Sequence, residues 1–315
     1  MKCFWPTFLF LLAFFAVTDP LMAQMPQLAG GKLVRHAGFP SKKVPNRNVD
    51  VWLPDGYDPG KKYPVLYMQD GQMLFDSSQT WNRQEWQLDE NLTELIRQQK
   101  IKQVIVVAIW NSVDGRHADY MPQKPFESLS KVLQDSLYHG KRQSGASVFN
   151  GQKVRSDAYL KFLVEELKPF IDGHYSTYTD AKHNFIGGSS MGALLSVYAI
   201  CEYPQVFGGA ICMSTHWSGI FVLKDDPLPG AFLKYLKTRL PSPASHKIYF
   251  DHGDQTLDGW YGDIQKKVDQ LMRTKGYKQG KNWMSRVFPG EDHSEKAWSR
   301  RLKIPLIFML GDQNN

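Results

Sequence analysis

The amino-acid sequence predicts an α/β fold, in which a mostly parallel central sheet carries helices on both faces. Strand-like and helix-like runs alternate along the chain after about residue 60, as parallel sheets require. Some of the strand-like runs are apolar throughout, which is typical of strands covered on both faces. No internal repeat or linker divides the chain. These observations favour a single domain over residues 24–315.

The first half of the chain provides three of the expected strands and two helices. Val49, Val51 and Leu53 alternate with polar or amphipathic partners and predict an early half-buried strand. Short apolar strands are expected over 63–68 and 104–110, and an amphipathic helix over 81–99 lies between them. Leucines and tyrosines at helical spacing predict another helix over 157–171.

The second half continues the alternation. We expect strands over 184–187, 209–213, 247–250 and 283–288, and helices over 191–202 and 261–275. The segment from Ser294 onward begins helical, and Pro305 is expected to break it. The stretches 111–153 and 218–245 are expected to be irregular, and long irregular segments of α/β domains are often the walls of a site.

The N-terminus has the layout of a secretory signal peptide over 1–23. Lys2 precedes a run without charge over 4–17, Asp19-Pro20 ends that run, and Leu21-Met22-Ala23 offers a cleavage site. The run is shorter than the roughly 20 apolar residues of a membrane span. We therefore expect an exported protein, periplasmic or extracellular, with no stable membrane insertion after cleavage. The alternative is an uncleaved anchor.

The composition excludes several classes of protein. With 42% hydrophobic and 13% aromatic residues in 315, the chain is too apolar to be disordered. The net charge of +7 comes from dispersed Lys and Arg without a binding motif, so no nucleic-acid partner is expected. The charge is at most a hint of an anionic substrate. Beyond the signal, Cys201 and Cys212 lie in apolar stretches and either pair or remain buried thiols.

The segment Gly188-Ser189-Ser190-Met191-Gly192 fits the pattern Gly-x-Ser-x-Gly and predicts a nucleophile at Ser190. It follows an expected strand and precedes an expected helix, which is the context that this motif requires. Small residues must flank so sharp a turn, and the new helix directs its first N–H groups at developing negative charge. The alternative is a tight turn without catalytic function.

A serine needs a base, and in this architecture the base follows the last strand. His293 occupies that position. The acid that orients the base is expected after the preceding strand. Asp251 is too close to the strand end to reach over easily, which leaves Asp254 and Asp258 as alternatives.

An oxyanion hole needs two N–H donors, one after the nucleophile and one after an early strand. We expect the backbone of Met191 and of Gln72, with Gly71 allowing the close approach. The alternative for the second segment is an ordinary Asp-Gly turn. Five side chains at expected strand ends or in the irregular stretches are predicted to line the substrate pocket: Trp110, Arg116, Tyr120, His216 and Trp217.

At these residues the chain resembles the putative esterase family of α/β-hydrolases, which includes the esterase D type, enterochelin-type siderophore esterases, and feruloyl or acetyl-xylan esterases. The resemblance runs from about residue 48 to residue 310. It rests on Val51-Trp52-Leu53-Pro54, on 67–72 with Phe75, on 81–86, on 188–192, on Tyr203-Pro204 with 206–210, on 250–258, and on 290–293 with Trp298.

The resemblance implies an α/β-hydrolase fold and a Ser-His-acid hydrolase without metal or cofactor, with Ser190 as nucleophile and His293 as base. Relatives with a similar 251–258 segment favour Asp258 as the acid, whereas other branches place the acid where this chain has Thr256. The expected function is a secreted carboxylic-ester hydrolase that works through an acyl-enzyme. Its substrate would be a siderophore ester or a feruloylated or acetylated polysaccharide fragment. The alternatives are a non-catalytic ligand-binding homologue and an acyltransferase that uses the same site.

Overall fold

The computed structural model describes residues 25–141, 145–220 and 226–311. The expected signal peptide lies outside the described residues, so its prediction stays untested. Within the described part of the chain, no helix is long and apolar enough to cross a membrane.

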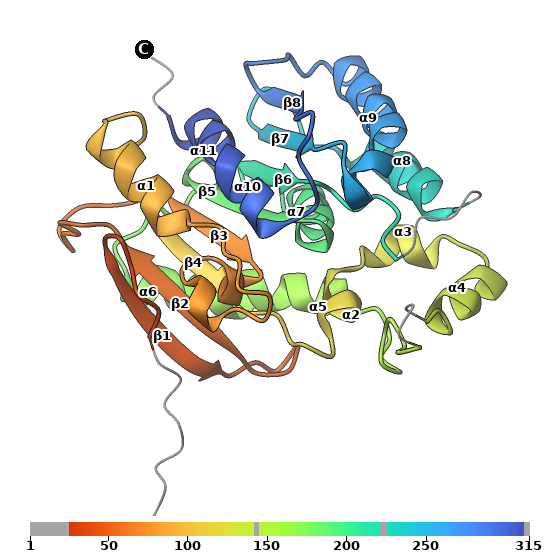
Figure 1. The fold of residues 1–315 in the computed structure, drawn as a ribbon, viewed down its shortest axis with the longest axis horizontal. Helices are drawn as coiled ribbons and strands as arrows, with labels where there is room; N and C mark the ends of the chain where they lie inside the picture. Colours follow the sequence, from red (N-terminus) through yellow and green to blue (C-terminus); the bar gives the residue numbers. More distant parts are fainter. Residues whose placement is uncertain (1–24, 142–144, 221–225, 312–315) are drawn as a thin grey trace, which may run out of the picture.

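An eight-stranded sheet forms the centre of the molecule (Figure 1). Its strand order is β1-β2-β4-β3-β5-β6-β7-β8. Only β2 among these eight runs against the others, because β1 and β4 both pair with it antiparallel and the remaining pairs are parallel. The predicted mostly parallel sheet is thus confirmed. The strands are β1 (Lys32–Phe39), β2 (Arg47–Leu53), β3 (Val65–Gln69), β4 (Ile105–Ile109), β5 (Asn184–Ser189), β6 (Gly209–Met213), β7 (Lys247–His252) and β8 (Trp283–Val287).

Helices cover both faces of the sheet, as predicted (Figure 1). Each face has its own apolar core, because alternate residues of a strand point to opposite sides. One face carries α1 (Leu88–Arg97), α10 (Glu295–Arg301) and α11 (Lys303–Leu310). The other carries α5 (Ser156–Lys161), the π-helical turn η3 (Phe162–Leu167), α6 (Lys168–His174), α7 (Met191–Glu202), α8 (Leu228–Arg239) and α9 (Gly262–Thr274).

Two expected helices begin or break elsewhere. The helix expected over 81–99 begins only at Leu88, because Arg83 and Gln87 adopt positive φ angles of 56° and 50°. The C-terminal break falls at Leu302, which separates α10 from α11. Pro305 therefore lies in the first turn of α11, where a missing N–H leaves no helical hydrogen bond unmade.

The two irregular stretches contain more helix than expected. The first holds the short helices α2 (Arg116–Tyr120), α3 (Gln123–Glu127) and α4 (Lys131–Tyr138), and the second holds α8. The edge strand β1 was not expected from the sequence pattern either.

The parallel strands bring several chain segments to one edge of the sheet. The turns after β3, β5, β6 and β7 all leave the carboxyl ends of neighbouring strands. In open α/β sheets this edge is where ligands bind. The predicted nucleophile, acid and oxyanion segments all follow these strands.

Candidate active site

Ser190 stands at the turn between β5 and α7 with a φ angle of 54° and a ψ angle of −121°. Its N–H donates to the carbonyl of Met213 (3.0 Å), and its carbonyl accepts from the N–H of Leu194 (3.0 Å). Such a conformation in a residue with a Cβ costs about 1–3 kcal/mol and is concentrated at functional sites. The side chain is partly exposed, so a substrate can reach it.

The two glycines of the motif are required by close packing against Gln69 at the end of β3. A Cβ on Gly188 or on Gly192 would lie 3.0 Å from the Cβ of Gln69. The sharp turn is therefore wedged between β5 and the β3 segment. Any larger residue at either glycine would push the turn away from the sheet.

His293 and Asp258 form the base–acid pair of the site. The Nδ1 atom of His293 lies 2.5 Å from Oδ1 of Asp258. The Asp258 side chain is fully buried, and burial alone would raise its pKa. Hydrogen bonds and charge from His293, followed by hydrogen bonds from Ser214 and Gly253, outweigh burial and lower the pKa of Asp258. The carboxylate is thus held in its charged form beside the imidazole.

The other residues of the acid segment hold the histidine loop rather than its ring. The Oδ1 atom of the exposed Asp254 accepts from the N–H of Gly290 (2.7 Å), three residues before His293. The Thr256 hydroxyl accepts from the N–H of His293 itself (3.0 Å). Asp251 pairs instead with Arg301 behind the site. Of the three aspartates, Asp258 alone contacts the imidazole ring.

The Ser190 hydroxyl has no hydrogen bond to the described residues, so the structure does not join Ser190 directly to His293. The two are linked through a neighbouring histidine. The N–H of His216 donates to the Ser190 carbonyl (3.2 Å), and His216 Nδ1 lies 2.6 Å from the hydroxyl of Tyr261. The Tyr261 ring centroid is 5.8 Å from that of His293. Nucleophile–base bonds are often long without substrate and tighten when it binds.

The two predicted oxyanion donors lie on turns that pack against each other. Met191 is the first residue of α7, and the first N–H groups of a helix have no acceptor within it. Gln72 lies in the short 3₁₀ turn η1 (Gly71–Met73), which follows Asp70 with its left-handed φ of 56°. A Cβ on Gly192 would lie 3.3 Å from Oδ2 of Asp70, so the turns are adjacent. The roles of both N–H groups remain predictions.

Arg116 holds the second turn in place. Its Nε and Nη2 atoms donate to the two oxygens of Asp70, each at 2.7 Å, and the Asn111 side-chain amide adds a bond of 2.6 Å. The N–H of Asp70 donates to the Tyr120 hydroxyl (3.3 Å). Predicted to line the pocket, Arg116 and Tyr120 are found to brace the oxyanion segment.

The other three predicted pocket residues are also engaged within the protein. The Trp110 indole N–H donates to Asp50 Oδ2 (2.8 Å). Trp217 is 1% exposed and donates from Nε1 to Gln265 (3.0 Å). Burial lowers the pKa of His216 to about 4, so this ring is neutral near pH 7. Direct contact with substrate remains untested for all five residues.

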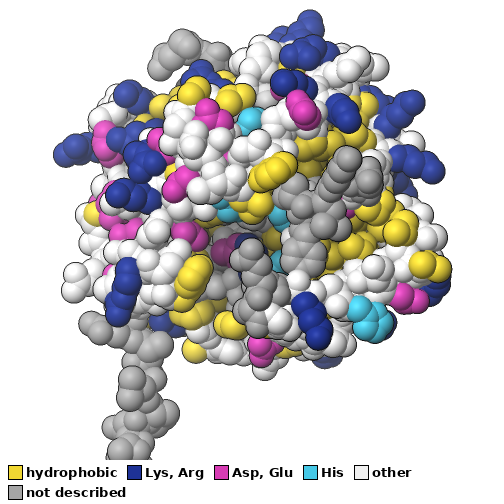
Figure 2. Space-filling view, turned by 45° about the vertical axis from the view of Figure 1, so that its right-hand side comes forward, with side chains coloured by type: hydrophobic (Ala, Val, Ile, Leu, Met, Phe, Trp, Pro, Cys, Tyr) yellow, Lys and Arg dark blue, Asp and Glu magenta, His cyan; other side chains and the backbone are white. Residues whose placement is uncertain are grey.

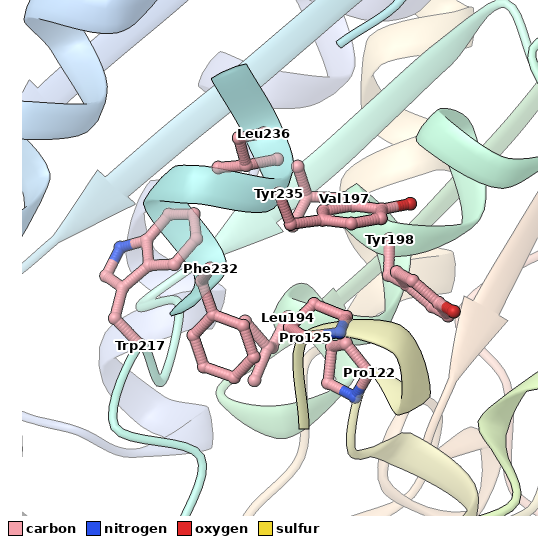
Figure 3. A pocket seen from close by; sticks show the side chains of 9 residues that line it. All are labelled: Pro122, Pro125, Leu194, Val197, Tyr198, Trp217, Phe232, Tyr235 and Leu236. Atoms are coloured by element: carbon pink, nitrogen blue, oxygen red, sulfur yellow. The ribbon is translucent and has the colours of Figure 1, made fainter. Parts of the chain in front are cut away.

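A small apolar pocket lies beside Trp217, between α3, α7 and α8. Figure 3 shows the side chains that surround it, and none of them is charged. They are Pro122, Pro125, Leu194, Val197, Tyr198, Trp217, Phe232, Tyr235 and Leu236. The face in Figure 2 is hollowed near its centre, with hydrophobic and His side chains beside the hollow and Lys and Arg towards the rim.

Two expectations concern metals and thiols. Among the described residues, no group of three or more His, Cys, Asp or Glu side chains is arranged to hold a metal ion. Cys201 and Cys212 are both buried and unpaired in this structure, and burial raises the pKa of each thiol.

Sequence reasoning missed three residues behind the base–acid pair: Ser214, Trp298 and Arg301. Trp298 belongs to a quoted motif, but without an assigned role. Ser214 lies directly after β6, and its position at a strand end was the one signal that could have found it. Arg301, 43 residues after Asp258 in the chain, carried no such signal.

We expect Gly71→Ala to destabilise the oxyanion segment. An added Cβ would lie 2.5 Å from the carbonyl carbon of Ala108 in β4, and backbone cannot yield as a flexible side chain does. The free energy of unfolding should fall by roughly 1–3 kcal/mol, as overpacking does elsewhere. Urea denaturation measures it. Gly56→Ala is an imperfect comparison because its φ is 71°, whereas Gly173→Ala meets open space in α6 and should not destabilise the protein. Equal stability of the Gly71 and Gly173 variants would contradict the prediction.

Comparison with protein families gives one matching model. The family described as "Putative esterase" matches residues 44–308. Two curated relatives from Bacillus subtilis (strain 168) are uncharacterized proteins, and each is 27% identical to this chain. YbbA aligns over 279 residues, 85% of this chain and 94% of its own length. YjcH aligns over 167 residues, so the chain spans about half of that relative: 54% of its length, against 53% of this chain.

Solved structures with this fold include two esterases. A ferulic acid esterase has a TM-score of 0.62 at 20% identity, covering 89% of this chain and 98% of its own. The enterobactin esterase FES from Shigella flexneri, solved in the presence of 2,3-dihydroxy-N-benzoyl-glycine, has a TM-score of 0.60 at 18% identity. That match covers 90% of this chain and 60% of the enterobactin esterase. At these identities the likeness shows the α/β-hydrolase-like fold.

Proposed function

The chain belongs to the putative esterase family, and on that premise we propose that it is a serine hydrolase that cleaves carboxylic esters through an acyl-enzyme. The observation that carries the proposal is the buried Asp258–His293 pair, 2.5 Å between Oδ1 and Nδ1. It stands at the same edge of the sheet as the strained turn that presents Ser190. A base oriented by a buried acid serves to activate a hydroxyl nucleophile.

In the proposed reaction, His293 Nε2 takes the proton of the Ser190 hydroxyl as Ser190 Oγ attacks the ester carbonyl. The N–H groups of Met191 and Gln72 stabilise the resulting oxyanion, which is usually the largest electrostatic contribution to such a reaction. His293 then gives the proton to the leaving alcohol. A water molecule, deprotonated by His293, releases the acid and restores Ser190. Asp258 stays ionised throughout and stabilises the imidazolium.

For the substrate we propose a siderophore ester or a feruloylated or acetylated polysaccharide fragment, met outside the cytoplasm. The proposal is supported by the names of two proteins with this fold, a ferulic acid esterase and an enterobactin esterase. It is also supported by exposed indoles on two segments next to the base. Trp81 is 84% exposed, and Trp260 is 68% exposed and directly follows the acid segment. Indole faces stack well on aryl groups and on sugars.

The test uses two sets of esters. Nitrophenyl acetate and butyrate first report whether the protein hydrolyses esters, and we expect saturable release of nitrophenol. Feruloyl, acetyl-xylan and ferric-siderophore esters then compare substrate classes by kcat/KM. Product analysis in the presence of a sugar alcohol distinguishes hydrolysis, which yields the free acid, from transfer, which yields a new ester. A rate equal to that of buffer alone on every ester would contradict the proposed function.

A further inference from the structure

A buried polar cluster lies behind the Asp258–His293 pair, and the proposed reaction does not use it. It consists of Ser214 after β6, Asp251 on β7, and Trp298 and Arg301 on α10 and at its end. All four are at most 4% exposed. Burying a charge such as that of Arg301 is costly unless every partner is in place. A cluster of this kind beside the acid therefore needs a physical account.

The hydroxyl of Ser214 has only one possible orientation in this cluster. A serine hydroxyl donates one hydrogen bond and accepts two. Trp298 Nε1 lies 2.9 Å from Ser214 Oγ and Arg301 Nη2 lies 2.8 Å from it. Indole and guanidinium nitrogens donate and cannot accept. Both acceptor positions of Ser214 are thus filled, and its proton must go to Asp258 Oδ2, 2.6 Å away.

This forced donation fixes the rotation of the Asp258 carboxylate. Its Oδ2 atom also accepts from the N–H of Gly253 (2.6 Å), and Arg301 Nη2 adds an ion-pair contact at 3.6 Å. With Oδ2 engaged on that side, Oδ1 is presented to His293. The acid segment alone does not do this, because Gly253 supplies a single donor.

Asp251 anchors the cluster from below. Its two oxygens accept from Arg301 Nη2 (3.1 Å) and Nε (3.2 Å), and Oδ2 also accepts from the Tyr249 hydroxyl (2.8 Å). The N–H of Ser214 donates to the Asp251 carbonyl (2.8 Å) and approaches Asp251 Oδ1 (3.2 Å). Asp251 therefore holds both Arg301 and the backbone of Ser214.

We propose that Ser214, with its hydroxyl oriented by Trp298 and Arg301, is a positioning residue that holds the acid Asp258 in the geometry that His293 needs. The inference rests on the proposed function, since positioning matters only if Asp258 and His293 act together. It adds to that function a residue that touches neither substrate nor reacting atoms. Small misplacements of catalytic groups are costly, on the order of a hundredfold for about 1 Å.

Two variants test the proposal by kinetics. Ser214→Ala removes the donor, and we expect kcat to fall by roughly ten- to a hundredfold, with KM unchanged because Ser214 does not touch substrate. Trp298→Phe keeps an aromatic ring beside His293, whose centroid lies 5.1 Å away, but removes the N–H that orients the hydroxyl. Its kcat should fall by a smaller factor. The matched controls are Ser156→Ala and Trp283→Phe, which alter a buried serine and a buried tryptophan outside the cluster.

A spectroscopic measurement separates positioning from general loss of structure. The Nδ1 proton of a histidine bound to a carboxylate gives a far-downfield proton NMR signal, assigned here by its loss in His293→Gln. We expect this signal in the wild type and both controls, and expect it shifted or broadened in Ser214→Ala. An unchanged signal together with a kcat equal to that of Ser156→Ala would overturn the proposal. If instead the wild type hydrolyses no ester, the proposed function fails, while the signal still reports the geometry of Asp258 and His293.

Discussion

Ser190→Ala is expected to reduce kcat/KM on nitrophenyl esters by about 10⁵-fold, or to the background rate. The hydroxyl of Ser190 is the one nucleophile that the strained turn after β5 presents at the edge where His293 stands. Without it no acyl-enzyme forms, and only binding and oxyanion stabilisation remain. Steady-state rates measured beside the wild type, with intact-mass detection of the acyl-enzyme, check this result.

The matched control for this change is Ser189→Ala, the neighbouring serine of the same motif. Ser189 is the last residue of β5 and is 5% exposed, so it is in no position to reach a substrate. We expect this variant to keep most of its activity and to form the acyl-enzyme. Loss of activity in both variants alike would point to collapse of the turn, and full activity in Ser190→Ala would refute Ser190 as nucleophile.

The second large effect concerns the choice of acid. Asp258→Asn should lower kcat by about 10³- to 10⁴-fold. The amide keeps the shape of the carboxylate, but it carries no charge to stabilise the imidazolium and presents the wrong hydrogen-bonding group to His293 Nδ1. KM should change little, because Asp258 is fully buried.

Asp254→Asn is the matched comparison, four residues earlier in the same segment. Its carboxylate is exposed and accepts from Gly290 and Gln255, both of which an amide oxygen still accepts from. Its loss should cost far less than that of Asp258. Thermal melting of both variants verifies that they are folded. Abolished turnover in Asp254→Asn with activity retained in Asp258→Asn would reverse the assignment.

Much of the fold was predictable because its signals are local. The elements over 191–202 and 209–213 coincide with α7 and β6, since apolar runs and their flanking residues determine where each begins and ends. The helix expected over 81–99 was wrong in its first seven residues. There the apolar spacing is helical, but the residues serve a loop that packs Trp86 against Trp298, 212 positions away.

The pocket residues and the acid show where local signals end. Trp217 and His216 follow β6 as a site residue should, yet the structure buries both against α9 and its first turn. Asp254 and Asp258 were equivalent by position alone. Their difference arises only when the loop around His293 folds over the acid segment, which buries one carboxylate and leaves the other exposed.

The sequence by itself determined the strand–helix alternation, the turn around Ser190 and the chain order of nucleophile, acid segment and histidine. These follow from residue spacing and from glycines whose requirement is steric and local. Only the tertiary structure decided that Asp258 faces His293 and that Ser214, Trp298 and Arg301 hold it there. The physical reason is that the partners of a buried charge are chosen by the packing of distant segments, because every donor and acceptor must be satisfied together once water is excluded.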